Sequence, residues 1–185
     1  LLDPQKSERD QAAADIKELL TIGRELGVVG LIMVPAFGPL RLPDLSPYAD
    51  SRELQDRLLV RLLSELGDHA AKVKCTILVE PLNGYEAQYL KRLDQAVDIA
   101  KKVKNPYVKI MADFFHMSIE ESDIAQSIKA ASSHIVHVHL ADGGEVAVQV
   151  QVEHQVRLAL VEVDRARMQD RLGIELDDLP ERLPG

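Results

Sequence analysis

The sequence predicts an α/β protein, because two kinds of apolar pattern alternate along its 185 residues. Four short apolar runs are typical of strands, and they lie at residues 28–34, 75–79, 107–112 and 134–141. Between them, apolar residues recur about once per helical turn, at residues 7–26, 52–72, 88–104 and 120–131. The strand-like runs are apolar on both faces, which is typical of a parallel sheet covered by helices.

The first helix and the first strand are expected on either side of a glycine. Ile16, Leu19, Leu20 and Ile22 lie about one turn apart, and Gly27 is placed where a glycine commonly ends a helix. The apolar run that follows stops at a proline, and the segment from residue 35 to residue 47 is rich in proline. We therefore expect a helix, a short strand and then an irregular loop.

The next elements follow the same alternation. Ser51 is a candidate N-cap for the helix over 52–72. That helix carries a stripe formed by Leu54, Leu58, Leu59, Leu62, Leu63 and Leu66. The following strand contains the single cysteine, Cys75, which we expect to be a buried, reduced thiol. Helices over 88–104 and 120–131 are expected to flank the third strand, and the fourth strand comes last.

Composition limits the kinds of partner. With 46% hydrophobic and 28% charged residues, the chain has the composition of a globular domain with a real core. Its net charge of −8 disfavours nucleic acid, because a phosphate backbone attracts cations. The longest apolar run has about seven residues, far fewer than the ~20 that a membrane span needs. The lone cysteine excludes a disulfide within the chain and favours a cytoplasmic location.

Polar residues at the strand ends favour a section of a (β/α)8 barrel over an open doubly wound sheet. No glycine-rich phosphate-binding pattern follows any strand, whereas Glu80, Asp113 and His139 end three successive strands. In a barrel the carboxyl ends of the strands meet at one rim, where active sites are built. Two carboxylates and an imidazole suit a divalent metal ion such as Mn²⁺, Mg²⁺, Co²⁺ or Zn²⁺.

Each of these residues could instead have an ordinary structural role, which is the alternative to a metal site. Glu80 precedes a proline and is equally typical of a solvated or helix-capping carboxylate. Asp113 is a candidate N-cap for the segment after it. His137 and His139 share one face of their strand, where hydrogen-bonded core histidines are common, and His134 is expected at the surface. Their joint position at three strand ends favours the shared site.

The motifs VEPLNGYE, MADFFHMSIEE and HVHLADG, in that order, resemble the sugar isomerase/epimerase family with a xylose-isomerase-like TIM barrel. The likeness extends over residues 10–142 and is strongest to the ketose 3-epimerase and hydroxypyruvate isomerase-like branches. It implies that Glu80, Asp113 and His139 hold the metal, with Mn²⁺ preferred. It also implies that Glu86 and His116 contact a sugar substrate, and that Glu80 is the base in a proton transfer through an enediolate.

The chain departs from this family pattern at both ends. We therefore assign residues 1–144 to a partial barrel domain that lacks the first strands, and residues 145–185 to an atypical C-terminal segment without a clear family match. Glu145 occupies the place of a substrate-binding arginine, and no last-strand glutamate is identifiable among Glu153, Glu162 and Glu175. Residues 145–153 alternate like a strand, and 154–172 are expected to be an amphipathic helix. The domain is therefore expected to be incomplete, to bind Mn²⁺ weakly and to turn over no ketose.

Two other functions and one mode of assembly are consistent with the same residues. An endonuclease IV-like abasic-site nuclease shares the barrel and similar ligands, although the acidic charge disfavours it. A barrel remnant that only binds or assembles is consistent with the atypical end. A partial parallel barrel leaves open edges, so we expect either a homo-oligomer or coverage of an edge by residues 146–152.

Overall fold

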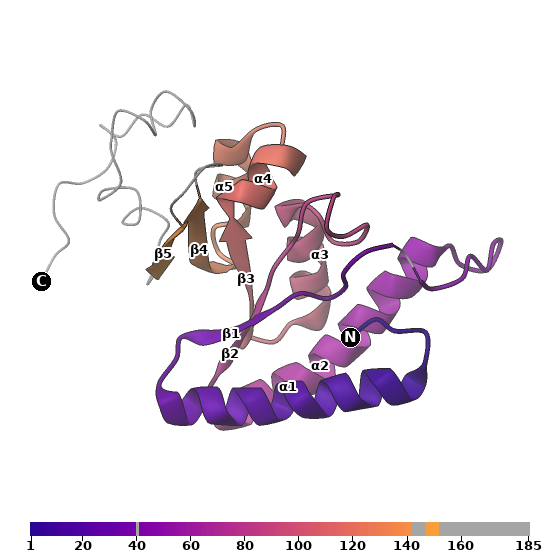
Figure 1. Cartoon of the computed structure of the whole chain (residues 1–185), viewed down its shortest axis with the longest axis horizontal. Helices are drawn as coiled ribbons and strands as arrows, with labels where there is room; N and C mark the ends of the chain where they lie inside the picture. The colour runs from indigo at the N-terminus through magenta and orange to yellow at the C-terminus, as the bar shows by residue number, and fades with distance from the viewer. Residues whose placement is uncertain (40, 142–146, 152–185) are drawn as a thin grey trace, which may run out of the picture.

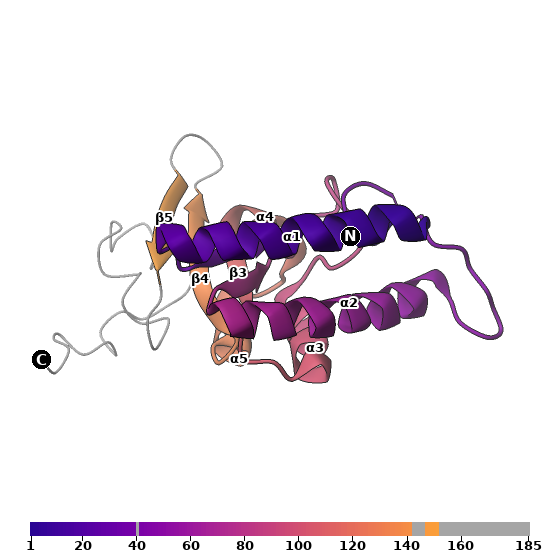
Figure 2. The same ribbon diagram turned by 90° about the horizontal axis from the view of Figure 1, so that it is seen from below.

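The computed structural model describes residues 1–39, 41–141 and 147–151, and its centre is a curved five-stranded sheet. The strands follow one another in chain order: β1 (Gly30–Met33), β2 (Thr76–Val79), β3 (Val108–Asp113), β4 (Ile135–Ala141) and β5 (Ala147–Gln151). The first four are parallel, and β5 is antiparallel to β4. Helices α1, α2 and α3 lie along the outer side of the sheet (Figures 1 and 2). The predicted α/β class with a parallel sheet is confirmed.

Helix α1 (Lys6–Leu26) ends where the sequence predicts. Gly27 adopts φ 71°, and its N–H donates to the carbonyl oxygens of Arg24 and Gly23. A residue with a Cβ is disfavoured in this left-handed conformation, which explains the glycine. The chain then turns directly into β1.

Helices α2 and α3 begin at positions that differ from the prediction. Helix α2 (Ser51–Val73) is capped by Asp50, whose side chain accepts from the Glu53 N–H at 2.7 Å, so the assignment of Ser51 as N-cap was wrong. Helix α3 (Leu93–Val103) starts five residues later than predicted. Leu90 has φ 58°, which no α-helix accommodates, and this keeps the preceding residues in a loop.

The segment after β3 forms two helices instead of one. Helix α4 (Phe114–Glu120) starts directly after Asp113, and helix α5 (Ile124–Ala131) is capped by Asp123. The predicted helix over 120–131 corresponds to α5, which starts four residues later because Asp123 caps it, whereas α4 was not predicted. Helix α4 is important for the site because it carries His116.

One apolar core joins the helices to the outer face of the sheet. Its most deeply buried members include Leu20, Leu59, Leu63, Leu66, Ile77, Leu93, Ile99 and Ile110. Cys75 is also buried and free, as predicted. The cytoplasmic location inferred from it stays a prediction. Within the described ranges, none of the helices has the length and apolar character needed to cross a membrane.

The two edges of the sheet differ. Residues 147–151 form the expected strand, and β5 covers the free side of β4 through an antiparallel ladder from His137–Gln151 to Ala141–Ala147. The predicted helix over 154–172 and the carboxylates Glu145, Glu153, Glu162 and Glu175 lie outside the described residues. At the opposite edge, β1 pairs only with β2 among the described strands.

We expect the chain to self-associate through this second edge. Beside it, Leu19, Ile22, Leu26, Val28 and Val29 are 41–75% exposed, and these five residues are called the α1–β1 surface here. Exposed aliphatic patches and unpaired strand edges both favour association. Sedimentation velocity over a range of concentrations should show a reversible shift to a larger species.

A matched pair of substitutions tests the location of that contact. Leu19 and Leu45 are both 48% exposed, but Leu45 lies in the loop before α2. Leu19→Asp should move the association to higher concentration, whereas Leu45→Asp should leave it unchanged. A monomer at every concentration, or equal effects of the two changes, would contradict this prediction.

Candidate metal and proton-transfer site

The strand register brings the predicted site residues to one end of the sheet. Asp113 is the last residue of β3 and pairs in register with His139 of β4, while Glu80 directly follows β2. Asp113 Oδ2 lies 3.4 Å from His139 Nδ1. Because parallel strands end at the same edge, side chains far apart in the sequence meet here.

Asp113 uses its two carboxylate oxygens differently. Oδ1 accepts from the backbone N–H of Phe115 at 2.8 Å and of His116 at 3.4 Å, and so caps helix α4. Oδ2 faces His139. The capping role weighed as the alternative for Asp113 is therefore real, and it leaves one oxygen free to act in the site.

Helix α4 brings His116 against Glu80. Its Nε2 lies 3.6 Å from Glu80 Oε1, and both residues are buried, with exposed fractions of 8% and 9%. On the other side of the ring, His116 Nδ1 lies 3.8 Å from Oε1 of the half-exposed Glu86. All five residues predicted for the site thus meet in one place.

The carboxylates repel one another in this buried setting. Burial, and then the negative charges of Asp113 and Glu86, together raise the pKa of Glu80 to about 7. Burial, followed by the neighbouring His139, lowers the pKa of His137. The site therefore holds more negative charge than its surroundings stabilise, and a bound cation would offset it.

The residues fit a divalent metal ion. Ligand atoms of Glu80, Asp113 and His116 all lie within 4.8 Å of one another. His139 lies beside the Asp113 carboxylate, and in the described part of the chain its buried Nε2 has no hydrogen-bond partner. Carboxylate oxygens with imidazole nitrogens are the usual ligands of Mn²⁺ and Zn²⁺. Which histidine serves as a ligand depends on the nitrogen that carries the proton.

One residue of the site was not singled out from the sequence. Asn83 is 1% exposed, and its side-chain nitrogen lies 2.8 Å from His116 Nδ1 and 3.1 Å from Glu86 Oε1. The only signal for it is its place in the motif VEPLNGYE, midway between Glu80 and Glu86. Its contact with a helix 33 residues further on is invisible to local pattern.

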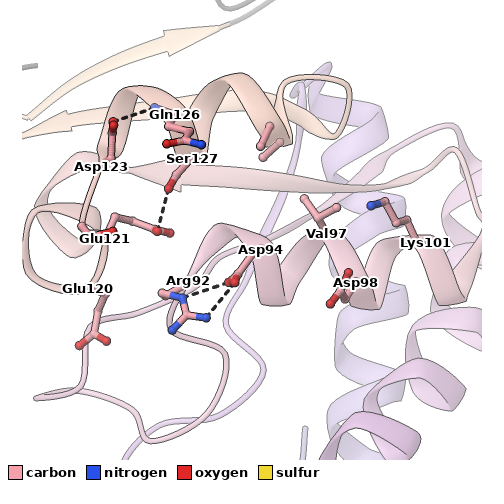
Figure 3. Close-up of a pocket in the computed structure, with 13 residues that line it drawn as sticks. Arg92, Asp94, Val97, Asp98, Lys101, Glu120, Glu121, Asp123, Gln126 and Ser127 are labelled. Carbon is pink, nitrogen blue, oxygen red and sulfur yellow. Dashed lines mark hydrogen bonds and ion pairs between the residues drawn. The ribbon is translucent and has the colours of Figure 1, made fainter. Parts of the chain in front are cut away.

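A separate hollow lies on the helical side of the sheet, between α3 and α5 (Figure 3). Arg92 and Asp94 bind each other there through contacts of 3.1 and 2.8 Å. Glu121 accepts from the Leu93 N–H, at the start of α3, and from Ser127 Oγ of α5, both at 2.8 Å. These charged groups cap and join helices, so the strand ends remain the candidate site.

Comparison with known proteins decides the family. The family model described as "Xylose isomerase-like TIM barrel" matches residues 1–167. The chain belongs to the xylose isomerase-like TIM barrel family. The resemblance and the partial-barrel fold inferred from sequence are thereby confirmed, whereas the boundary between residues 144 and 145 stays a prediction.

The curated members of this family that the chain matches are sugar epimerases and isomerases. A D-psicose 3-epimerase from Enterocloster bolteae is 37% identical over 83 residues, which are 45% of this chain and 28% of that protein. A 3-dehydro-D-guloside 4-epimerase from Escherichia coli is 33% identical over 131 residues, which are 69% of this chain and 49% of that protein. The chain thus spans half or less of the length of both relatives.

Solved structures agree with this family relationship. The apo crystal structure of 3-keto-D-glucoside 4-epimerase from E. coli superposes with a TM-score of 0.66 at 28% sequence identity. The superposition covers 76% of this chain and 54% of that one. The described sheet therefore corresponds to part of the family's barrel.

Proposed function

We propose that the chain carries the proton-transfer site of a metal-dependent isomerase or epimerase acting on a ketose or a related sugar. The meeting of Glu80 with Asp113 and two histidines at the strand ends is the observation that supports this best. The epimerase relatives agree with it.

Glu80 is the proposed base. Its carboxylate is buried beside His116 and Asp113, where it can reach a proton on a bound sugar, and in the metal-free chain burial with neighbouring charge raises its pKa to about 7. It takes the proton from the carbon next to the sugar carbonyl, which leaves an enediolate. Glu86 and His116, which lie next to each other and beside Glu80, are the proposed groups that bind the hydroxyl and carbonyl oxygens and hold that carbon against the carboxylate.

Glu80, Asp113 and His139 are the proposed metal ligands, with Mn²⁺ preferred over Mg²⁺, Co²⁺ and Zn²⁺. The ion would supply the positive charge that lowers the energy of the enediolate oxygens. Burial of Glu80 and His116 keeps water from the reacting carbon and strengthens these electrostatic interactions. Three ligands already give a site that a metal titration can detect.

Hydrogen exchange tests the base without requiring a complete reaction. One carboxylate suffices to exchange the proton next to the carbonyl with solvent, whereas epimerisation needs a second group on the other face. In D₂O with Mn²⁺, we expect deuterium to enter a ketohexose or ketopentose at that carbon without formation of the epimer. NMR or mass spectrometry of the recovered sugar measures the deuterium content at that carbon, and NMR measures the amount of epimer.

Two matched glutamine variants test whether Glu80 is the residue that catalyses the exchange. Glu80→Gln should lower the exchange rate by at least about 100-fold, because general base catalysis contributes 10² to 10⁴ in rate. Glu18→Gln, on the exposed face of α1, should leave the rate unchanged. Absence of Mn²⁺-dependent exchange with any ketose would contradict the proposed reaction, and formation of the epimer would contradict the expectation of an incomplete site.

A further inference from the structure

We infer that Asn83 fixes the tautomer of His116, so that this histidine presents a proton, and not a lone pair, to the site. The role of this His116 tautomer in catalysis rests on the proposed function. The hydrogen bonds that carry the inference do not depend on it. Asn83 is thus a positioning residue that acts through His116.

The orientation of the Asn83 side chain follows from a backbone group. The N–H of Tyr85 donates to Asn83 Oδ1 at 2.9 Å, and a peptide N–H acts only as a donor. The oxygen must therefore face Tyr85, and the NH₂ group must face Glu86 Oε1 at 3.1 Å and His116 Nδ1 at 2.8 Å. Both amide hydrogens then have an acceptor.

Two donors converge on His116 Nδ1. Besides the side-chain NH₂, the backbone N–H of Asn83 donates to the same nitrogen at 3.3 Å. Neither group can accept, so Nδ1 must carry the lone pair, and the neutral ring keeps its proton on Nε2. Glu86 Oε1 lies 3.8 Å from Nδ1, too far for a hydrogen bond that would favour the other tautomer.

The tautomer separates the roles of the two histidines. His116 Nε2 faces Glu80 Oε1 at 3.6 Å, and a nitrogen that bears a proton cannot bind a metal ion. His116 is therefore a hydrogen-bond donor to a substrate oxygen that enters beside Glu80. His139, beside Asp113, is left as the imidazole ligand.

The competing explanation is that Asn83 only forms a turn. Its Oδ1 does accept from the N–H two residues on, a common asparagine turn that aspartate forms equally well. Aspartate, however, has no side-chain N–H to donate to His116 or Glu86, and it offers His116 Nδ1 a carboxylate acceptor at 2.8 Å in place of the closer of the two donors. The change Asn83→Asp therefore keeps the turn and reverses the hydrogen bond to His116.

The ring nitrogens of His116 can be observed directly by long-range ¹H–¹⁵N NMR on the chain labelled at histidine, with His116→Gln to assign the signals. In the unmodified chain we expect the Nε2–H tautomer to exceed the other by more than about ten to one, because two donors of ordinary strength act together. Asn83→Asp should place a proton on Nδ1.

Asn105→Asp is the matched control. Asn105 Oδ1 accepts from the Tyr107 N–H at 3.0 Å in the same kind of turn, but away from His116. This change should leave the His116 signals unchanged. A proton on Nδ1 in the unmodified chain would overturn the inference, and so would an unaltered His116 spectrum in folded Asn83→Asp.

Zn²⁺, which is diamagnetic, separates this inference from the proposed function. On its addition we expect the ring signals of His139 to shift to those of a metal-bound nitrogen, while His116 keeps its Nε2 proton. Loss of that proton on Zn²⁺ binding would overturn the inference. If no histidine responds to Zn²⁺, the proposed metal site is wrong, whereas the tautomer is still decided by the metal-free spectra.

Discussion

Asp113→Asn is expected to weaken Mn²⁺ binding by at least about 100-fold while the chain stays folded. Replacing a group that merely supports a ligand typically costs 10- to 100-fold in metal affinity, so removing the charge of a proposed ligand should cost no less. Asparagine keeps the oxygen that caps helix α4 and replaces the oxygen that faces His139. Isothermal titration with Mn²⁺ measures the change.

The structure offers a matched control for this substitution. Asp123 caps helix α5 by accepting from the Gln126 N–H at 2.9 Å, and it is exposed. Asp123→Asn makes the same chemical change at the same kind of position, so Mn²⁺ affinity should not change. Asp113→Ala should abolish binding and also cost about 1 kcal/mol of stability through the lost cap. Mn²⁺ binding by Asp113→Asn equal to that of the unmodified chain would refute the proposed ligand role.

The parts of the fold that follow from local pattern were predictable. Strands β1 to β4 and helix α1 lie where apolar periodicity and Gly27 place them. Because parallel strands end on a common edge, the order of Glu80, Asp113 and His139 along the chain was enough to predict that they meet. Strand periodicity and the parallel topology were together sufficient to predict that these residues lie at one edge of the sheet.

Apart from the late start of α3, which follows from the positive φ of Leu90, the errors in helix boundaries arose where a side chain competes with the periodic pattern. Asp50, Asp113 and Asp123 each bind backbone N–H groups, and these caps fix helix starts that apolar spacing alone does not. The role of Asn83 depends on a contact with His116 that only the folded chain creates. This contact depends on how the segment after β2 and helix α4 pack against each other, and a local sequence pattern does not specify that packing.

In the presence of a chelator, Glu80→Gln should make the chain more stable at pH 8 and hardly more stable at pH 4. The pKa of Glu80 is raised from 4.5 to about 7 by burial, Asp113 and Glu86. Below pH 4.5 the carboxyl is neutral in the folded and the unfolded chain alike. As the pH rises towards 7 only the unfolded chain loses the proton freely, so the folded state loses stability, and above 7 the loss is complete.

The difference between the two pKa values corresponds to about 3 kcal/mol at pH 8. Glutamine has nearly the same shape and no charge, so the variant should escape this loss and melt about 5–10 °C higher. Glu18→Gln, exposed on α1, should melt like the unmodified chain at both pH values. Thermal unfolding followed by circular dichroism measures all three chains.

Mn²⁺ at 100 times its dissociation constant should cancel the advantage of Glu80→Gln at pH 8, because an ion bound only by the folded chain stabilises it by about 3 kcal/mol at that concentration. The unmodified chain should gain this stability, and Glu80→Gln should gain little. The same carboxylate would then destabilise the metal-free fold and hold the ion. If Glu80→Gln is less stable than the unmodified chain at pH 8 with chelator, the raised pKa of Glu80 in the metal-free chain is wrong.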